Sequence, residues 1–311
     1  MKFDRALIES IRINRSAVEA RAATLGTRRS FKKEAQVAAY LRAIQCLDLT
    51  TLAGGDTAGS VEGLCAKALN PVELETLEML GIRDIKITVG AVCVYHELLK
   101  TAKTVLKGRI PVAVVATGFA AGQNSLPSRW QDLRDSVKNG ADEVDVVISR
   151  RLALEGKWEA VYRELYEFKN ECGDKIKMKT ILGVGDLKTL DNVAKAAAVA
   201  IMAGSDFIKT STGFEPTNAT PETGLVMARQ IRRFLELSGG KDEVGFKAAG
   251  GIRTAKDAML WLTLMLEELG EEWTKPKLFR IGASSLLTDL ERQLYHLATG
   301  QYSDSHSHPM G

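Results

Sequence analysis

The sequence lacks the features of several large classes of protein. Its four cysteines, Cys46, Cys65, Cys93 and Cys172, show no paired short spacing, which argues against a disulfide framework and against a zinc site. With only four histidines and no carboxylate cluster, there is no pattern for another metal. The first residues alternate charged with apolar side chains, unlike a signal peptide, and no apolar run is long enough to span a membrane. We therefore expect a cytoplasmic protein without a metal site.

A charge excess of one sign is also missing. The 42 basic and 39 acidic residues leave a net charge of +3 that is spread along the chain, which favours neither nucleic acid nor a membrane as a partner. The basic cluster Arg28, Arg29, Lys32 and Lys33 stands at the start of an amphipathic helix. We interpret it as a solvated face rather than a binding patch.

Eight apolar segments, each followed by a helical pattern, run from residue 44 onward. The predicted strands are 44–51, 90–95, 110–117, 143–148, 177–182, a short strand from Phe207, 244–247 and 278–283. Near-continuous apolar runs are typical of parallel strands buried on both faces. They predict an α/β fold, a (β/α)8 TIM barrel in one domain over 1–311, with a helical extension over 1–43 and a mobile tail over 301–311. A doubly wound open sheet is the alternative, but Gly54-Gly55 does not match its glycine-rich fingerprint.

Four ionisable residues fall on the strand face that points into the barrel. Side chains alternate along a strand, so Asp145, Lys179, Lys209 and Lys247 are predicted to lie inside on four successive strands, where barrels normally pack aliphatic residues. A buried ammonium is costly unless it is paired. The pattern therefore favours a catalytic site, and a structural cluster of ion pairs is the alternative.

The chemistry of these residues suits a covalent intermediate. Lys209 as a neutral amine could attack a carbonyl and form a carbinolamine and then a Schiff base. A cationic Lys247 on the next strand would lower the pKa of Lys209 by like-charge repulsion. Asp145 could hold Lys247 and move protons, directly or through a water. Alternatively, Lys209 snorkels from a strand end or pairs with a carboxylate.

Glycine-rich turns follow the last two strands, at 249–253 and 282–285. Loops after strands seven and eight of barrels commonly bind phosphate through backbone N–H groups and a helix N-terminus, although such glycines can also serve as tight turns. Near the end of the first strand, Asp48 and Thr50 could bond a hydroxylated substrate or act as capping or turn residues. Cys93 is interpreted as a small core residue rather than a reactive thiol.

These segments resemble, in order, those of the deoxyribose-phosphate aldolases, class I Schiff-base aldolases built on a (β/α)8 barrel. The matching segments are 47–52, 91–95, 140–148, 207–213, 250–255 and 279–285. The long N-terminal region and the extra helix before the second strand resemble the longer, eukaryote-type members. The resemblance covers the chain from about residue 44 to the last helix.

The resemblance implies roles for individual residues. Lys209 would form the Schiff base, Lys247 would perturb it and Asp145 would relay protons. The residues expected to face the substrate are Asp48, Thr50, Cys93, Lys179 and Thr212. The residues expected to bind its phosphate are Gly213, Gly250, Gly251, Gly282, Ser284 and Ser285.

The implied reaction is the reversible cleavage of 2-deoxy-D-ribose 5-phosphate to acetaldehyde and D-glyceraldehyde 3-phosphate, without a cofactor, in deoxyribonucleotide catabolism. A homodimer is possible. Alternatives are another Schiff-base phosphosugar aldolase or transaldolase, and a phosphosugar-binding barrel without chemistry. The sequence departs from the family at Phe214, where a lysine is frequent, and at Ala248 and His96, where proline is common. Phe214 could weaken phosphate binding or relax the choice of acceptor.

Overall fold

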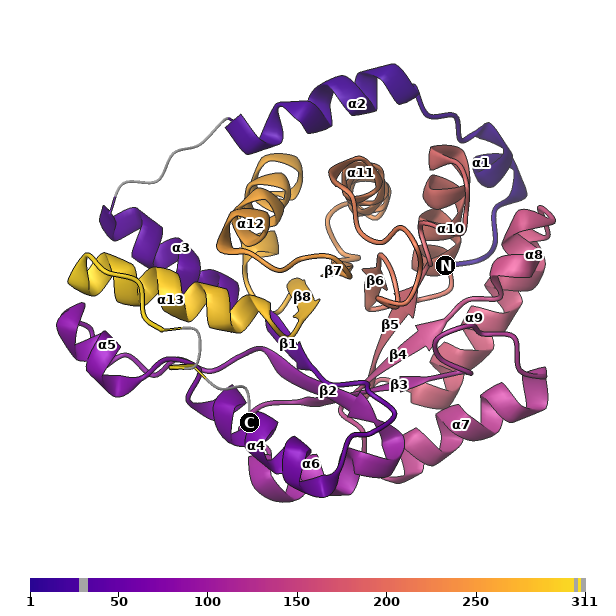
Figure 1. Cartoon of the computed structure of the whole chain (residues 1–311). Coiled ribbons are helices and arrows are strands. Elements are labelled where there is room, and N and C mark those ends of the chain that lie inside the picture. The colour runs from indigo at the N-terminus through magenta and orange to yellow at the C-terminus, as the bar shows by residue number, and fades with distance from the viewer. Residues whose placement is uncertain (28–32, 305–306, 309–311) are drawn as a thin grey trace.

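Figure 1 shows a computed structural model of the chain, which describes residues 1–27, 33–304 and 307–308. Eight parallel strands follow one another around a closed barrel, and β1 pairs with β8. The strands are β1 (Leu47–Thr50), β2 (Ala91–Tyr95), β3 (Val112–Ala116), β4 (Glu143–Val147), β5 (Lys177–Ile181), β6 (Phe207–Lys209), β7 (Gly245–Ala249) and β8 (Phe279–Ala283). Closure confirms the predicted (β/α)8 barrel and excludes the open sheet.

Helices cover the outside of this barrel. They are α4 (Ala58–Leu69), α5 (Leu74–Met79), α6 (Leu99–Leu106), α7 (Leu126–Lys138), α8 (Arg150–Leu154), α9 (Trp158–Cys172), α10 (Leu190–Met202), α11 (Pro221–Leu237), α12 (Ala255–Leu269) and α13 (Leu286–Thr299), with short 3-10 turns η2 (His96–Leu98) and η3 (Glu271–Thr274). Capping residues fix where some of them begin. The side chains of Thr220 and Thr254 accept the third-residue N–H of α11 and α12. None of the described helices is long and apolar enough to cross a membrane.

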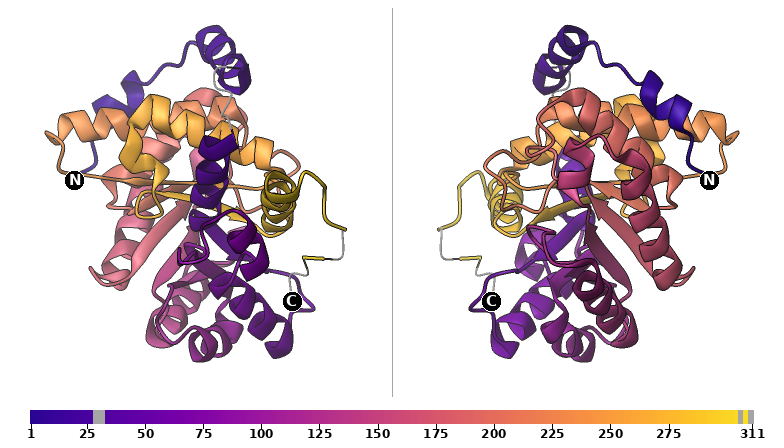
Figure 2. Two further views of the ribbon diagram at one scale, coloured as in Figure 1. Left: turned by 90° about the vertical axis from the view of Figure 1, so that its left-hand side faces the viewer. Right: turned by 90° about the vertical axis from the view of Figure 1, so that its right-hand side faces the viewer.

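The N-terminal region forms the predicted helical extension. It contains α1 (Arg5–Ser10), α2 (Arg15–Ala23), η1 (Leu25–Thr27) and α3 (Lys33–Gln45). These helices lie outside the barrel helices, α1 against α10, α2 against α11, and α3 against α12 and α13 (Figures 1 and 2). Because α3 continues to Gln45, β1 begins three residues later than predicted. Most of the basic cluster at 28–33 lies outside the described residues.

The predicted tail is partly outside the described residues as well. The His296 ring stacks on Tyr302, and His308 is buried, with Nε2 at 2.8 Å from the Ser303 hydroxyl. These described parts of the tail pack on the body of the protein. Mobility of 301–311 as a whole stays a prediction.

The hydrophobic core lies between the barrel and the helices. Outward-facing Phe246 of β7 stacks on Trp261 of α12, with ring centroids 5.7 Å apart. Apolar burial on this side is the main stabilising contribution. The inner side is different. There Phe207 needs glycine at position 245, since a Cβ at that position would lie 2.4 Å from its ring, and the neighbouring inward positions carry charges.

Candidate active site

The carboxylate of Asp145 brings together the three lysines predicted to lie inside the barrel. Its Oδ2 accepts from Lys209 Nζ and from Lys247 Nζ, both at 2.7 Å, and its Oδ1 accepts from Lys179 Nζ at 2.9 Å. Lys209 and Lys247 are direct partners in the β6–β7 register. Because their nitrogens share one oxygen, they cannot lie further apart than twice the bond length, which is close enough for each charge to act on the other.

Two further charged residues extend the network and were missed in the sequence. Arg280 bonds Asp48 Oδ1 at 2.6 Å and Glu143 Oε1 at 3.0 Å, while Glu143 Oε2 lies 2.6 Å from Lys179 Nζ. The alternation of side chains could have revealed both. Glu143 stands two residues before Asp145, and Arg280 two residues before Gly282, so both share the inward face.

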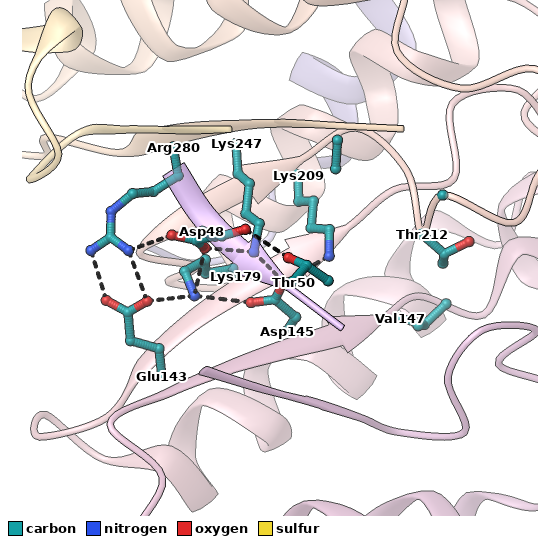
Figure 3. A network of polar contacts seen from close by, with 12 residues as sticks. Asp48, Thr50, Glu143, Asp145, Val147, Lys179, Lys209, Thr212, Lys247 and Arg280 are labelled. Carbon is teal, nitrogen blue, oxygen red and sulfur yellow. Dashed lines mark hydrogen bonds and ion pairs between the residues drawn. The ribbon is translucent and has the colours of Figure 1, made fainter. Parts of the chain in front are cut away.

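We call these seven ionisable residues the lumen cluster. Its members are Asp48, Glu143, Asp145, Lys179, Lys209, Lys247 and Arg280, all at most 4% exposed. In Figure 3 the cluster runs from Arg280 and Glu143 at one end to Lys209 at the other, with Thr212 beyond it. Within the described ranges, no charged side chain outside the cluster forms an ion pair with it.

The charges of the lumen cluster balance only if Lys209 is neutral. Three carboxylates face three other cations, Lys179, Lys247 and Arg280. A proton on Lys209 would add an uncompensated charge at a site that is 3% exposed. Since an isolated buried charge costs several kcal/mol, the barrel favours the free amine at this position.

The pKa shifts have the same direction. Burial lowers the pKa of Lys209, and the Lys247 ammonium lowers it further, while Asp145 opposes both. Burial also disfavours charge on Lys247, but Asp145 and Asp48 outweigh it and raise the pKa of Lys247. For Asp145, burial is outweighed by its three lysines, which hold its pKa well below the usual range. These directions favour the free amine at Lys209 and the ammonium at Lys247.

A cavity of about 360 Å³ opens above Lys209. Its wall contains Lys209, Thr50, Thr212 and all six residues predicted to bind phosphate, which are Gly213, Gly250, Gly251, Gly282, Ser284 and Ser285. It also contains exposed Arg253, which was not singled out in the sequence. The structure thus brings the predicted amine and the predicted phosphate loops to one cavity.

Backbone conformation shapes the phosphate side of this cavity. Gly250 and Gly251 have φ of +87° and +81°, a region that favours glycine. Ser285 is the N-cap residue of α13, so the cavity also meets a helix N-terminus. Gly282 matters because of its size, since a Cβ there would lie 3.1 Å from Lys247 Cε. Its small size leaves room for the second lysine.

Other predicted residues lie elsewhere or have partners already. Asp48 and Lys179 are fully buried in the lumen cluster, and Cys93 is fully buried, which raises the pKa of its thiol. The Thr212 hydroxyl donates to Glu215 at 2.8 Å, and the Gly213 N–H donates to the same carboxylate at 3.1 Å. Substrate contacts by these five residues stay predictions. Phosphate binding by Gly250, Gly251, Ser284 and Ser285, which line the cavity, also stays a prediction.

A group of aromatic rings lies near Lys209. Phe119 lies with its ring centroid 5.9 Å from Lys209 Nζ, and makes edge contacts with Tyr95 and Phe214 at 6.0 and 5.7 Å. Phe214 is 63% exposed and lines the cavity. Position 214, where lysine is frequent in the family, thus carries an uncharged ring that makes an edge contact with Phe119.

Comparison with known proteins agrees with this geometry. Proteins named deoxyribose-phosphate aldolase from Bos taurus and Homo sapiens are 51% and 50% identical over 312 residues, covering 99% of this chain and 97% of theirs. The crystal structure of a putative deoxyribose-phosphate aldolase from Toxoplasma gondii shares the fold, with a TM-score of 0.72 over 86% of this chain and 97% of that one, at 23% identity. The DeoC/LacD family aldolase model matches residues 42–290. The chain therefore belongs to the DeoC/LacD family of aldolases.

Proposed function

We propose that this aldolase cleaves 2-deoxy-D-ribose 5-phosphate reversibly to acetaldehyde and D-glyceraldehyde 3-phosphate through a Schiff base on Lys209. The observation that supports the mechanism is the charge balance of the lumen cluster, which favours a free amine at Lys209. Full-length identity to the mammalian aldolases supports the substrate. The reaction belongs to the breakdown of deoxyribonucleotides.

We infer the reaction steps from the groups that lie near Lys209. The Lys209 nitrogen adds to the aldehyde carbon of the open-chain sugar, and the carbinolamine loses water to give a protonated Schiff base. A base takes the proton of the C3 hydroxyl, the C2–C3 bond breaks, and its electron pair forms an enamine on Lys209 as glyceraldehyde 3-phosphate leaves. Protonation of the enamine at C2 and addition of water then release acetaldehyde.

Asp145 and Lys247 are the groups that can move these protons. The Asp145 carboxylate touches both lysines, so it can pass a proton between Lys247 and the substrate, directly or through a water. The three groups titrate as a coupled set. Lys179 and Arg280 act further away, since they hold Asp145, Asp48 and Glu143 in place.

Phosphate would bind at the loops after β7 and β8. Gly250, Gly251, Ser284 and Ser285 line the cavity near the N-terminus of α13, and their N–H groups and the serine hydroxyls are potential donors. Exposed Arg253 on the same wall can supply a cation. Because Phe214 supplies none, phosphate recognition depends on these loops.

Borohydride trapping tests the covalent step. With acetaldehyde present, reduction should fix a two-carbon adduct on Lys209, found by peptide mass analysis, and none without acetaldehyde. An adduct on another lysine would overturn the assignment of Lys209. No adduct on any lysine would favour the non-catalytic phosphosugar-binding barrel.

The exposed ring of Phe214 gives a prediction about substrate preference. Phe214→Lys places a cation at the cavity, which should lower the KM for deoxyribose 5-phosphate by about twofold to fivefold, as expected for one exposed charge pair. The KM for unphosphorylated 2-deoxyribose should change little, and Phe214→Met is the uncharged control. Equal changes for both substrates would show that position 214 does not meet the phosphate.

A further inference from the structure

Two ion pairs outside the lumen cluster join loops that follow neighbouring strands of the barrel. Arg150, the first residue of α8, places Nη1 at 2.7 Å from Asp186 Oδ2 and at 3.3 Å from Glu215 Oε1. The side chain of Arg150 is 10% exposed and that of Glu215 is 2% exposed. We call Arg150, Asp186 and Glu215 the mouth clamp. None of the steps above uses it.

Glu215 holds the segment that directly follows the reactive strand. Its carboxylate accepts the Thr212 N–H at 3.0 Å, the Gly213 N–H at 3.1 Å and the Thr212 hydroxyl at 2.8 Å. Gly213, with φ of +97°, turns the chain so that successive N–H groups meet one anion. Thr212 and Gly213 therefore face the cavity in an orientation set by Glu215.

Arg150 also holds the loop after β3. Its Nη2 donates to the carbonyls of Ala120 and Ala121, at 2.7 and 2.6 Å, which follow the ring that lies over Lys209. Glycine at 183 leaves room for this side chain, since a Cβ there would lie 2.6 Å from Arg150 Cδ. The guanidinium thus links the loops after β3, β5 and β6 from its place after β4.

We propose that Arg150 and Glu215 are positioning residues, which fix the Phe119 ring and the Thr212–Gly213 segment on either side of Lys209. Their effect on turnover rests on the proposed function, whereas their effect on loop order does not. The charge of Glu215 is needed because four donors converge on it. A neutral amide of the same shape accepts through one oxygen only and turns an N–H₂ toward these donors.

The decisive variant is Glu215→Gln, with Glu268→Gln as its matched control. The side chain of Glu268 is also buried, at 6% exposed against 2% for Glu215, and it also binds arginines. It lies at the C-terminal end of α12 and does not line the cavity. Two measurements are made on each full-length protein. One is hydrogen exchange of the backbone amides, and the other is the set of steady-state constants for deoxyribose 5-phosphate and 2-deoxyribose.

Glu215→Gln should lower the exchange protection of the Thr212 and Gly213 amides by at least about tenfold. It should raise the KM for the phosphorylated sugar by about tenfold, while trapping of acetaldehyde on Lys209 stays within about twofold. Glu268→Gln should change neither the protection of these amides nor this KM.

Unchanged protection at Thr212 and Gly213 would overturn the proposal, and so would equal loss of protection and activity in both variants. The exchange result stands even if the wild-type protein fails to cleave the sugar. In that case the proposed function falls, and loss of protection confined to Glu215→Gln still supports the clamp.

Discussion

Lys209→Ala is expected to reduce the release of acetaldehyde from deoxyribose 5-phosphate by about 10⁴–10⁶-fold, because no other group can form the covalent intermediate. Binding and the proton-moving groups remain, so a small residual rate is compatible with the mechanism. The measurement is a coupled assay of aldehyde release at saturating substrate. Release close to that of the wild type would reject the role of Lys209.

The charge balance of the lumen cluster adds a stability test to this prediction. Methionine keeps the apolar stem of lysine, so Lys209→Met and Lys247→Met differ mainly in the charge they remove. Lys209→Met leaves three carboxylates with three cations and should lose little stability. In Lys247→Met alone, Lys209 can take up a proton beside Asp145 and replace the lost cation. The test therefore adds Lys247→Met to Lys209→Met, where one buried carboxylate is left uncompensated and a further loss of about 3–5 kcal/mol is expected in denaturant unfolding. If Lys209→Met alone already loses that much, the inferred free amine is wrong.

Asp145→Asn is expected to slow turnover by about 10²–10⁴-fold, the usual contribution of a general acid–base group. The side chain keeps its size and its place between the lysines, but its low-pKa carboxylate is gone. Single-turnover kinetics would locate the loss in proton transfer and carbon–carbon cleavage. A change within a few fold would make Asp145 a structural partner only.

The pH profile of kcat/KM tests how the Asp145 carboxylate acts on the pKa of Lys209. Burial lowers the pKa of Lys209, and the Asp145 carboxylate opposes that effect. Removing the carboxylate should lower this pKa further, so the acid limb of kcat/KM, where it reports deprotonation of Lys209, should move to lower pH. A limb that moves to higher pH would contradict the assigned sign. Circular dichroism on the same samples excludes unfolding as the cause.

Much of the barrel and of the reactive centre could be predicted from the sequence because both follow a strict period. In β4, Val144 and Val146 fix which side meets the helices, so Asp145 has to point inward. The same reasoning places Lys179, Lys209 and Lys247. Thr220 and Thr254 mark the starts of α11 and α12 because a cap is a local signal.

The remaining features depend on contacts between distant segments. Asp48 was expected to meet substrate, but only the closed barrel shows that Lys247 and Arg280 bind its carboxylate. Glu215 lies in an irregular loop, where no periodicity indicates that it meets Arg150. The end of α3 was also missed, since Ile44 suits a strand as well as a helix and only packing decides.

The charged interior of the barrel limits which substitutions the protein can tolerate there. Most barrels can exchange one inward aliphatic residue for another, one at a time, with modest losses. Here six inward residues are charged, and each forms an ion pair with another residue of the lumen cluster. Replacing these residues without loss of stability therefore requires double substitutions that remove one acid together with one base. Only Lys209, which we infer to be neutral, can be replaced alone without leaving an unpaired buried charge, and that replacement removes the chemistry.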